Sequence, residues 1–159
     1  MELKRIGKLV IAIIFCQIAG AIGAIFTMPA INNWYAGITK ASFNPPNWIF
    51  LPAWTILFTL MGISLFLIAE KGIKEKKVNA AIAFFAIQLI LNIVWSLLFF
   101  GLKKPMFAFF EIILLWLAIL GTIIKFYPIS KKAAWLLVPY LLWVSFAAIL
   151  NFFVWQLNK

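Results

Sequence analysis

The chain has 159 residues, of which 66% are hydrophobic and only 11% are charged. Soluble globular proteins contain roughly 45–50% apolar residues, so this composition excludes an ordinary soluble domain and predicts a chain that lies mostly in lipid. The net charge of +10 does not indicate a nucleic-acid partner, because the lysines stand in short clusters between apolar runs and no nucleic-acid-binding motif accompanies them.

Two residue types that carry much protein chemistry are scarce. There are no histidines, which removes the commonest general base, metal ligand and haem ligand. The single cysteine, Cys16, cannot form an intrachain disulfide and is expected to be a small packing residue. We expect no metal site and no required cofactor.

The first apolar run, residues 9–26, predicts a membrane-spanning helix. A signal peptide is the alternative, but 18 residues is long for its hydrophobic region, and the rest of the chain is equally apolar. Small residues at a spacing of four let another helix approach closely. We expect this face to pack inside a bundle, with a dimer face as the alternative; its residues are Ala12, Cys16, Gly20 and Ala24, with Ala19 and Gly23 beside them.

The stretch WYAGITKASFNPPNWIFLPAW, from Trp34 to Trp54, departs most from what a lipid-facing helix needs. Its tryptophans and prolines predict a loop followed by a helix start. Pro29 is expected to end the first helix, and residues 31–43 are expected to form the loop.

A second helix is predicted over residues 45–69. Asn44 is the expected N-cap, and Pro45 and Pro46 would occupy the first helical positions, where a missing N–H costs little. Pro52 lies inside this helix and predicts a kink.

A third helix is predicted over residues 78–102. Gln88, Asn92 and Ser96 recur every four residues, so they share one face, and Trp95 lies next to it. Because an unpaired amide is costly in hydrocarbon, this face is expected to point into the bundle.

The fourth predicted helix, residues 105–124, contains Glu111, the one acid within an apolar run. Glu111 lies roughly 9 Å along the helix axis from Pro105, too deep for a carboxylate to face lipid. We expect an interior site for it, functional or structural.

The last predicted helix covers residues 133–157 and is expected to kink at Pro139. One of its faces carries Trp143, Ala147, Leu150 and Asn151.

Five spans place the two termini on opposite sides of the membrane. The N-terminus and the loops after the second and fourth helices carry ten of the 14 Lys and Arg residues. The positive-inside rule therefore predicts a cytoplasmic N-terminus, with the first loop and the C-terminus outside.

Catalytic and metal chemistry have little support. No GxSxG or P-loop pattern occurs, and Glu111 has no second acid at ligand spacing. A pocket is better supported, because Trp54, Trp95 and Trp143 share helical faces with amides, prolines or alanines. Facing aromatic rings with a few polar groups favour a flat, mostly apolar ligand. The alternative, interfacial belts and core packing, is expected for Trp135 and Trp155.

The stretch from residue 34 to residue 54 resembles the signature loop of the TspO/MBR family, the tryptophan-rich sensory proteins that include the mitochondrial translocator protein. The segments QLILNIVWSLLFFG (88–101) and PYLLWVSFAAILNFFVW (139–155) are similar to the third and fifth helices of that family. The resemblance covers nearly the whole chain, as a single domain over residues 1–159.

This resemblance implies an all-α integral membrane protein, a bundle of five transmembrane helices, usually a homodimer, in this case in a bacterial cell membrane. It implies a pocket closed by the first loop for porphyrins and other tetrapyrroles, or for drug-like ligands. Carried over by position, the pocket residues are Tyr35, Phe50, Leu51, Trp54, Asn92, Trp95, Phe107, Phe110, Glu111, Trp143, Ala147, Leu150 and Asn151.

The chain departs from the animal members of the family at several positions. Animal members have an aspartate at the position of Glu111 and a tryptophan at that of Phe107. Their cholesterol motif needs a tyrosine followed by a basic residue near the C-terminus, where this chain has Phe152, Phe153 and Gln156. High-affinity cholesterol binding is therefore not expected.

Three functions remain open. The first is tetrapyrrole binding as a sensor, scavenger or carrier, with Lys40 or loop N–H groups meeting the propionates and a preference for metal-free porphyrin. The second is an enzyme that oxidises porphyrin in light, with Trp54 and Trp143 supplying electrons or radicals. The third is a porphyrin transporter, although no internal repeat is visible.

Overall fold

The protein is described here by a computed structural model covering residues 2–159, in which every regular element is helical. Five helical stretches are long and apolar enough to cross a membrane. This confirms the predicted all-α fold of five spanning helices. The elements are α1 (Glu2–Ile31), α2 (Trp34–Gly37), a 3-10 turn (Asn47–Ile49), α3 (Phe50–Ala69), α4 (Lys76–Ser96), a π-helical turn (Leu97–Gly101), α5 (Pro105–Phe126), α6 (Lys131–Leu136) and α7 (Val138–Leu157).

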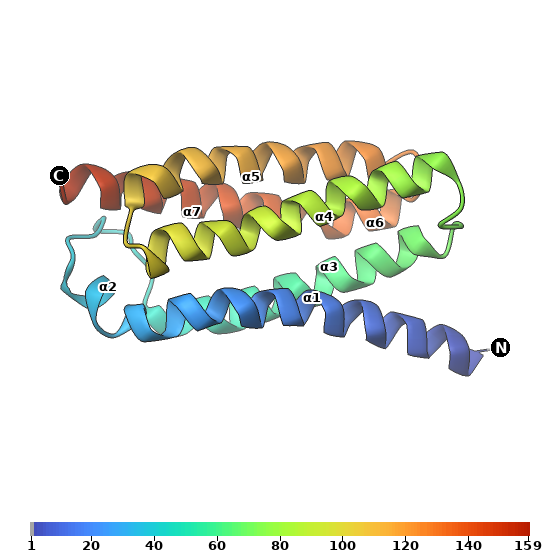
Figure 1. The fold of residues 1–159 in the computed structure, drawn as a ribbon, viewed down its shortest axis with the longest axis horizontal. Coiled ribbons are helices and arrows are strands. Elements are labelled where there is room, and N and C mark those ends of the chain that lie inside the picture. The colour runs from blue at the N-terminus through green and yellow to red at the C-terminus, as the bar shows by residue number, and fades with distance from the viewer. Residues whose placement is uncertain (1) are drawn as a thin grey trace.

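The long helices lie side by side along one axis, with the N-terminus at one end and the C-terminus at the other (Figure 1). α1 packs against α3 and α4, and α5 packs against α4 and α7. The short helix α6 packs on α3 and α5. The loop that contains α2 covers the end of the bundle where α7 finishes (Figure 1).

Small residues bring α1 and α3 unusually close. A Cβ atom added to Gly62 would lie 2.5 Å from the Cα of Ile13, and one added to Gly20 would lie 2.6 Å from the Phe58 ring. Cys16 is completely buried, which agrees with a packing role. The small-residue face of α1 is therefore used for packing within one chain, as expected.

Pro29 does not end the first helix, which continues to Ile31. Pro29 cannot donate to the carbonyl of Ile25, yet the chain keeps its helical path for two more residues. The side chain of Asn33 donates a hydrogen bond of 2.9 Å to the carbonyl of Pro29, which satisfies one of the free carbonyl groups at this helix end.

The second spanning helix starts later than predicted, and Asn44 is not its N-cap. Pro46 has extended backbone angles, so Pro45 and Pro46 precede the helix, which begins with the 3-10 turn at Asn47. The side chain of Asn44 instead accepts a hydrogen bond from the Tyr35 hydroxyl. Pro52 lies in the first turn of α3, directly after the 3-10 turn, and it cannot donate to the carbonyl of Trp48.

The helix over residues 131–157 is interrupted, as the proline in it predicts. α6 ends at Leu136 and α7 begins at Val138, so the break lies at Leu137, just before Pro139. Pro139 cannot donate to the carbonyl of Trp135, which the N–H of Leu137 approaches instead.

Candidate functional site

A cavity of about 690 Å³ lies between α1, α3, α4 and α7, at the end of the bundle that α2 covers. A ligand pocket typically has a volume of roughly 300–1,000 Å³, so the space suits one organic molecule of moderate size. Nine of its 27 lining residues are aromatic. The rings come from Tyr35, Trp48, Phe50, Trp54, Phe58, Trp95, Phe99, Phe100 and Trp143.

Ten of the residues predicted for the pocket line this cavity. They come from the loop that contains α2, which we call the lid, and from three helices that are far apart in the sequence. Only the fold brings them together. They are Tyr35, Phe50, Leu51, Trp54, Asn92, Trp95, Trp143, Ala147, Leu150 and Asn151.

The two tryptophans predicted as photochemically active are neighbours. The ring centroids of Trp54 and Trp143 are 6.4 Å apart and the rings are nearly perpendicular. Phe50 packs against Trp143 at 6.2 Å, and Trp54 contacts Tyr140 at 6.2 Å. Edge-to-face packing of this kind holds each ring in place at the cavity wall.

The opposite wall is held by hydrogen bonds between buried side chains. The indole N–H of Trp95 donates to Oδ1 of Asn151 at 3.0 Å, and the amide of Asn151 donates to the carbonyl of Pro105 at 2.7 Å. Asn92 donates to the hydroxyl of Tyr140 at 2.9 Å. Because buried polar groups are costly when unpaired, these bonds fix the orientation of both asparagines and of Trp95.

The lid is tied down by its own polar residues. The Tyr35 hydroxyl donates to Oδ1 of Asn44 at 2.8 Å, and Tyr35 is 3% exposed. Burial raises the pKa of the Tyr35 phenol, and the hydrogen bond to Asn44 opposes that rise. The backbone of Thr39 exchanges two hydrogen bonds with the side chain of Asn158, which attaches the lid to the end of α7.

Lys40 is not among the residues that line the cavity, and its predicted contact with ligand propionates stays a prediction. Its ammonium group donates to the carbonyls of Tyr35 and Ile38, at 2.6 and 3.0 Å. The same group lies 4.9 Å from the centroid of the Tyr35 ring. Lys40 therefore stabilises the lid from within.

Phe107 and Phe110 do not line the cavity either. Their side chains are 55% and 56% exposed on the outer surface of α5. The inward face of α5 carries Ala108, Ile112 and Leu115. With 3.6 residues per turn, positions 107 and 110 fall outside that face.

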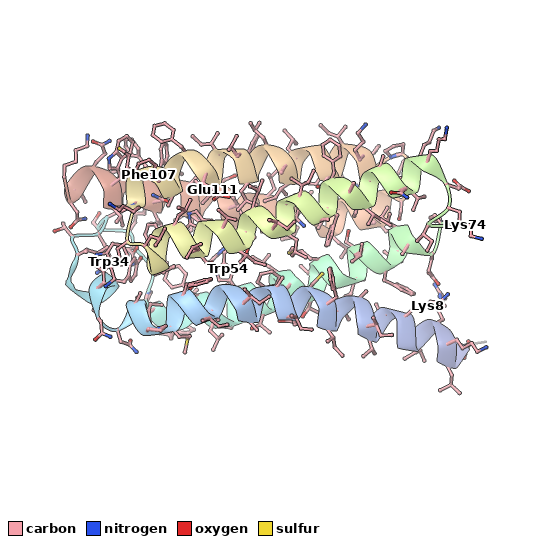
Figure 2. The ribbon with its side chains drawn as sticks, viewed as in Figure 1. Lys8, Trp34, Trp54, Lys74, Phe107 and Glu111 are labelled. Atoms are coloured by element: carbon pink, nitrogen blue, oxygen red, sulfur yellow. The ribbon has the colours of Figure 1, made fainter. Side chains whose placement is uncertain are left out.

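Glu111 is buried, as predicted, but it is not part of the cavity wall. It is 7% exposed and projects from α5 into the bundle (Figure 2). Neither carboxylate oxygen has a hydrogen-bond partner within the described chain. Its carboxylate therefore lies unpaired inside the bundle, and its predicted contact with a ligand stays a prediction.

Sequence reasoning missed several lining residues. Phe99 and Phe100 are consecutive, yet both are buried in the cavity wall, because the π-helical turn adds a residue per turn and rotates both rings inward. No periodic pattern indicates such a turn. Gly20, Gly23 and Ala24 of α1 also line the cavity, and the small-residue spacing was the signal for them.

The cavity opens on one side, between α1 and the start of α3. Three lining residues there are largely exposed: Met28 by 57%, Trp48 by 73% and Leu51 by 65%. The polar side chains of Asn32 and Asn47 line the same region. The opening therefore has an apolar rim with two amides beside it.

Within residues 2–159, no group of three or more metal-ligating acids or cysteines occurs.

Comparison with known proteins identifies the family. The model of the TspO/MBR family matches residues 12–156. A "Tryptophan-rich protein TspO" of Chlorobaculum tepidum is 45% identical over 155 residues, which is 98% of either chain. A "Tryptophan-rich sensory protein" of Cereibacter sphaeroides is 34% identical over 91% of each chain. The human "Translocator protein" is 35% identical over 86% of this chain and 82% of its own. With its five apolar helices, this chain is an integral membrane protein that belongs to the TspO/MBR family.

Proposed function

We propose that the protein binds a tetrapyrrole, such as protoporphyrin IX, in the aromatic cavity and acts as a sensor, scavenger or carrier. The observation that supports this most is the aromatic wall contributed by α3, α4 and α7, with Trp54 facing Trp143. A flat conjugated ring buries a large apolar area against such a wall and gains offset or edge-to-face contacts. The proposal extends to drug-like ligands of the same shape.

The side opening suits the polar edge of the ligand. Propionate groups would remain at the opening, where the amides of Asn32 and Asn47 offer N–H donors. No histidine is present to bind iron axially, so metal-free porphyrin is expected to bind at least as tightly as haem.

Titration with protoporphyrin IX in detergent micelles, followed by tryptophan quenching, tests the binding. Saturable quenching is expected, with affinity about tenfold lower for Trp54→Ala and Trp143→Ala, since a lost ring costs roughly 1.4 kcal/mol or more. Trp135→Phe is the matched control, because Trp135 lies outside the cavity lining. Unsaturable quenching, or equal affinity in all variants, would exclude binding at this site.

A second candidate function, light-driven oxidation of the bound porphyrin by dioxygen, is favoured by the contacts among Trp143, Trp54 and Tyr140. The excited porphyrin would take an electron from an adjacent ring and pass it to dioxygen, which becomes superoxide. The porphyrin would then return an electron to the ring radical, and the resulting porphyrin cation radical would combine with superoxide to give the oxidised product. Illumination of the complex should then yield a new absorbing product that is lost in a Trp54→Phe/Trp143→Phe double variant. Bleaching at the rate of free porphyrin would leave binding alone.

We further propose that the protein is a homodimer in a bacterial cell membrane, with the N-terminus in the cytoplasm and the lid outside. The distribution of lysines and arginines supports this orientation.

Flux of porphyrin into protein-loaded vesicles, compared with empty ones, distinguishes a transporter from a sensor.

A further inference from the structure

We infer that the end of the bundle opposite the lid carries a specific site for an anionic phospholipid, in a groove between α3 and α6. The groove has a volume of about 460 Å³ and is lined by Leu67, Lys131, Lys132, Trp135 and Leu136. It is remote from the tetrapyrrole cavity, which lies under the lid.

The groove combines two lysines, which have no carboxylate partner within residues 2–159, with an apolar floor. Lys131 and Lys132 are exposed at the start of α6, and Leu67 and Leu136 are half-buried beneath them. The only ion pair among residues 2–159 joins Arg5 to Glu70, so no carboxylate neutralises either lysine. Basic pockets between transmembrane helices are the usual sites for anionic lipid headgroups.

Trp135 is placed for a second contact to the same lipid. Its side chain is 64% exposed, and no partner for its indole N–H is found in the described chain, whereas Trp95 and Trp116 both donate to side chains. Four residues separate Trp135 from Lys131, which corresponds to about 6 Å along the helix. At this offset, the lipid phosphate can contact the lysines while an ester carbonyl of the same lipid accepts from the Trp135 indole N–H. Interfacial tryptophans typically lie at this depth of the headgroup region.

The walls of the groove are held in place. The hydroxyl of Ser64 in α3 donates to the carbonyl of Ala133 in α6 at 2.7 Å, and both residues are completely buried. Lys131 is positioned over the ring of Tyr127, with its Nζ atom 5.6 Å from the ring centroid. The lysine heads are therefore presented by a fixed surface, although they remain accessible.

The surrounding charge favours an anionic lipid over a second copy of this chain. This end of the bundle carries ten Lys and Arg residues against three Glu residues, and Figure 2 shows Lys8 and Lys74 at the same end. Two copies meeting through the groove would bring like charges together. The cations are Lys4, Arg5, Lys8, Lys71, Lys74, Lys76, Lys77, Lys125, Lys131 and Lys132.

Native mass spectrometry of the full chain, released from detergent micelles, tests the site. With equimolar dioleoyl phosphatidylglycerol and dioleoyl phosphatidylcholine, we expect one phosphatidylglycerol to be retained preferentially. Each groove lysine is expected to contribute about fivefold in affinity, so Lys131→Gln/Lys132→Gln should lower retention by about thirtyfold. Lys76→Gln/Lys77→Gln removes the same charge from the start of α4, at the same end of the bundle, and should lower retention less than fivefold.

Two further arms separate the alternatives. Trp135→Phe keeps the ring and removes the N–H, and it should weaken retention of phosphatidylglycerol without changing protoporphyrin binding. Excess inorganic phosphate should not displace the lipid, because the acyl chains also occupy the groove.

Equal loss in both lysine double variants, equal retention of the two lipids, displacement by phosphate, or a change only in the monomer–dimer ratio would each overturn the proposal. If the double variant does not fold, Lys132→Gln and the choice between the two lipids by the unaltered chain decide.

Discussion

Replacing Asn151 with leucine tests how much the cavity wall depends on one buried amide. Asn151 is 1% exposed, accepts from the Trp95 indole at 3.0 Å and donates to the Pro105 carbonyl at 2.7 Å. Leucine has a similar size but can make neither bond. Asn151→Leu therefore leaves a buried N–H on Trp95 and the Pro105 carbonyl without this partner.

The expected loss of stability is about 2 kcal/mol. An orphaned buried polar group costs about 1–3 kcal/mol in water-soluble proteins. Interhelical hydrogen bonds inside membranes average only about 0.6 kcal/mol, because the alternative states also find partners. Two lost bonds would cost about 1.2 kcal/mol at the membrane average and about 2 kcal/mol at the lower limit for buried groups, and we expect the second value because both groups become unpaired. The released Trp95 ring should also weaken tetrapyrrole binding.

Unfolding in mixed dodecylmaltoside–SDS micelles, followed by far-UV circular dichroism, measures the loss. A double-mutant cycle with Trp95→Phe isolates the Trp95–Asn151 bond, and a coupling energy of about 0.6 kcal/mol or more is expected. An Asn151→Leu variant as stable as the unaltered chain, or strictly additive effects in the cycle, would refute the reasoning.

Three other changes test other parts of the fold. Gly62→Ala brings a Cβ atom to 2.5 Å from the α1 backbone, whereas ordinary contact begins at 3.4 Å, so α1 and α3 must separate by about 0.9 Å. Such overpacking costs about 1–3 kcal/mol in the same unfolding assay, while Gly7→Ala, which meets nothing within 4 Å, should be neutral or stabilising. Glu111→Leu removes two buried oxygens that have no hydrogen-bond partner, so it should stabilise the bundle by about 1–3 kcal/mol. The affinity for tetrapyrrole should stay unchanged. A loss of stability would mean that the carboxyl group has a partner. Finally, the hydrogen bond from Arg5 lowers the pKa of Glu70 below its ordinary value of 4.5, so the stability due to this pair is present at neutral pH and is lost as the pH falls through the lowered pKa. Glu70→Gln should therefore reduce the unfolding midpoint at pH 7 but not near pH 2, and an equal effect at both would contradict the assignment.

The number and identity of the spanning helices could be predicted from sequence alone. A span needs about 20 apolar residues, and five such runs are visible in the sequence. The tryptophan- and proline-rich stretch separates the first two runs and lysine-containing loops separate the others, so no tertiary contact was needed to recognise them. Helix ends were less predictable. Pro29 and Asn44 were assigned by local rules, but side-chain contacts from Asn33 and Tyr35 decide where these helices end and begin.

The candidate site was predictable where a helix is regular. Trp143, Ala147, Leu150 and Asn151 fall on one face of α7 by periodicity alone, and all four line the cavity. The π-helical turn breaks this rule and brings Phe99 and Phe100 into the wall together. Resemblance placed Phe107, Phe110 and Glu111 in the pocket, but the rotation of α5 against its neighbours turns two of them outward and buries the third behind the wall.

The sequence by itself therefore determined that this chain lies in lipid and which stripes of each helix avoid it. Hydrophobicity and helical periodicity are local properties, because each depends only on residues that are close together in the sequence. Only the tertiary structure decided that the small residues of α1 face the rings of α3, α4 and α7 across an open space. A cavity is the volume that packing leaves unfilled, so it depends on how helices distant in the sequence are rotated and spaced, which no single stretch specifies.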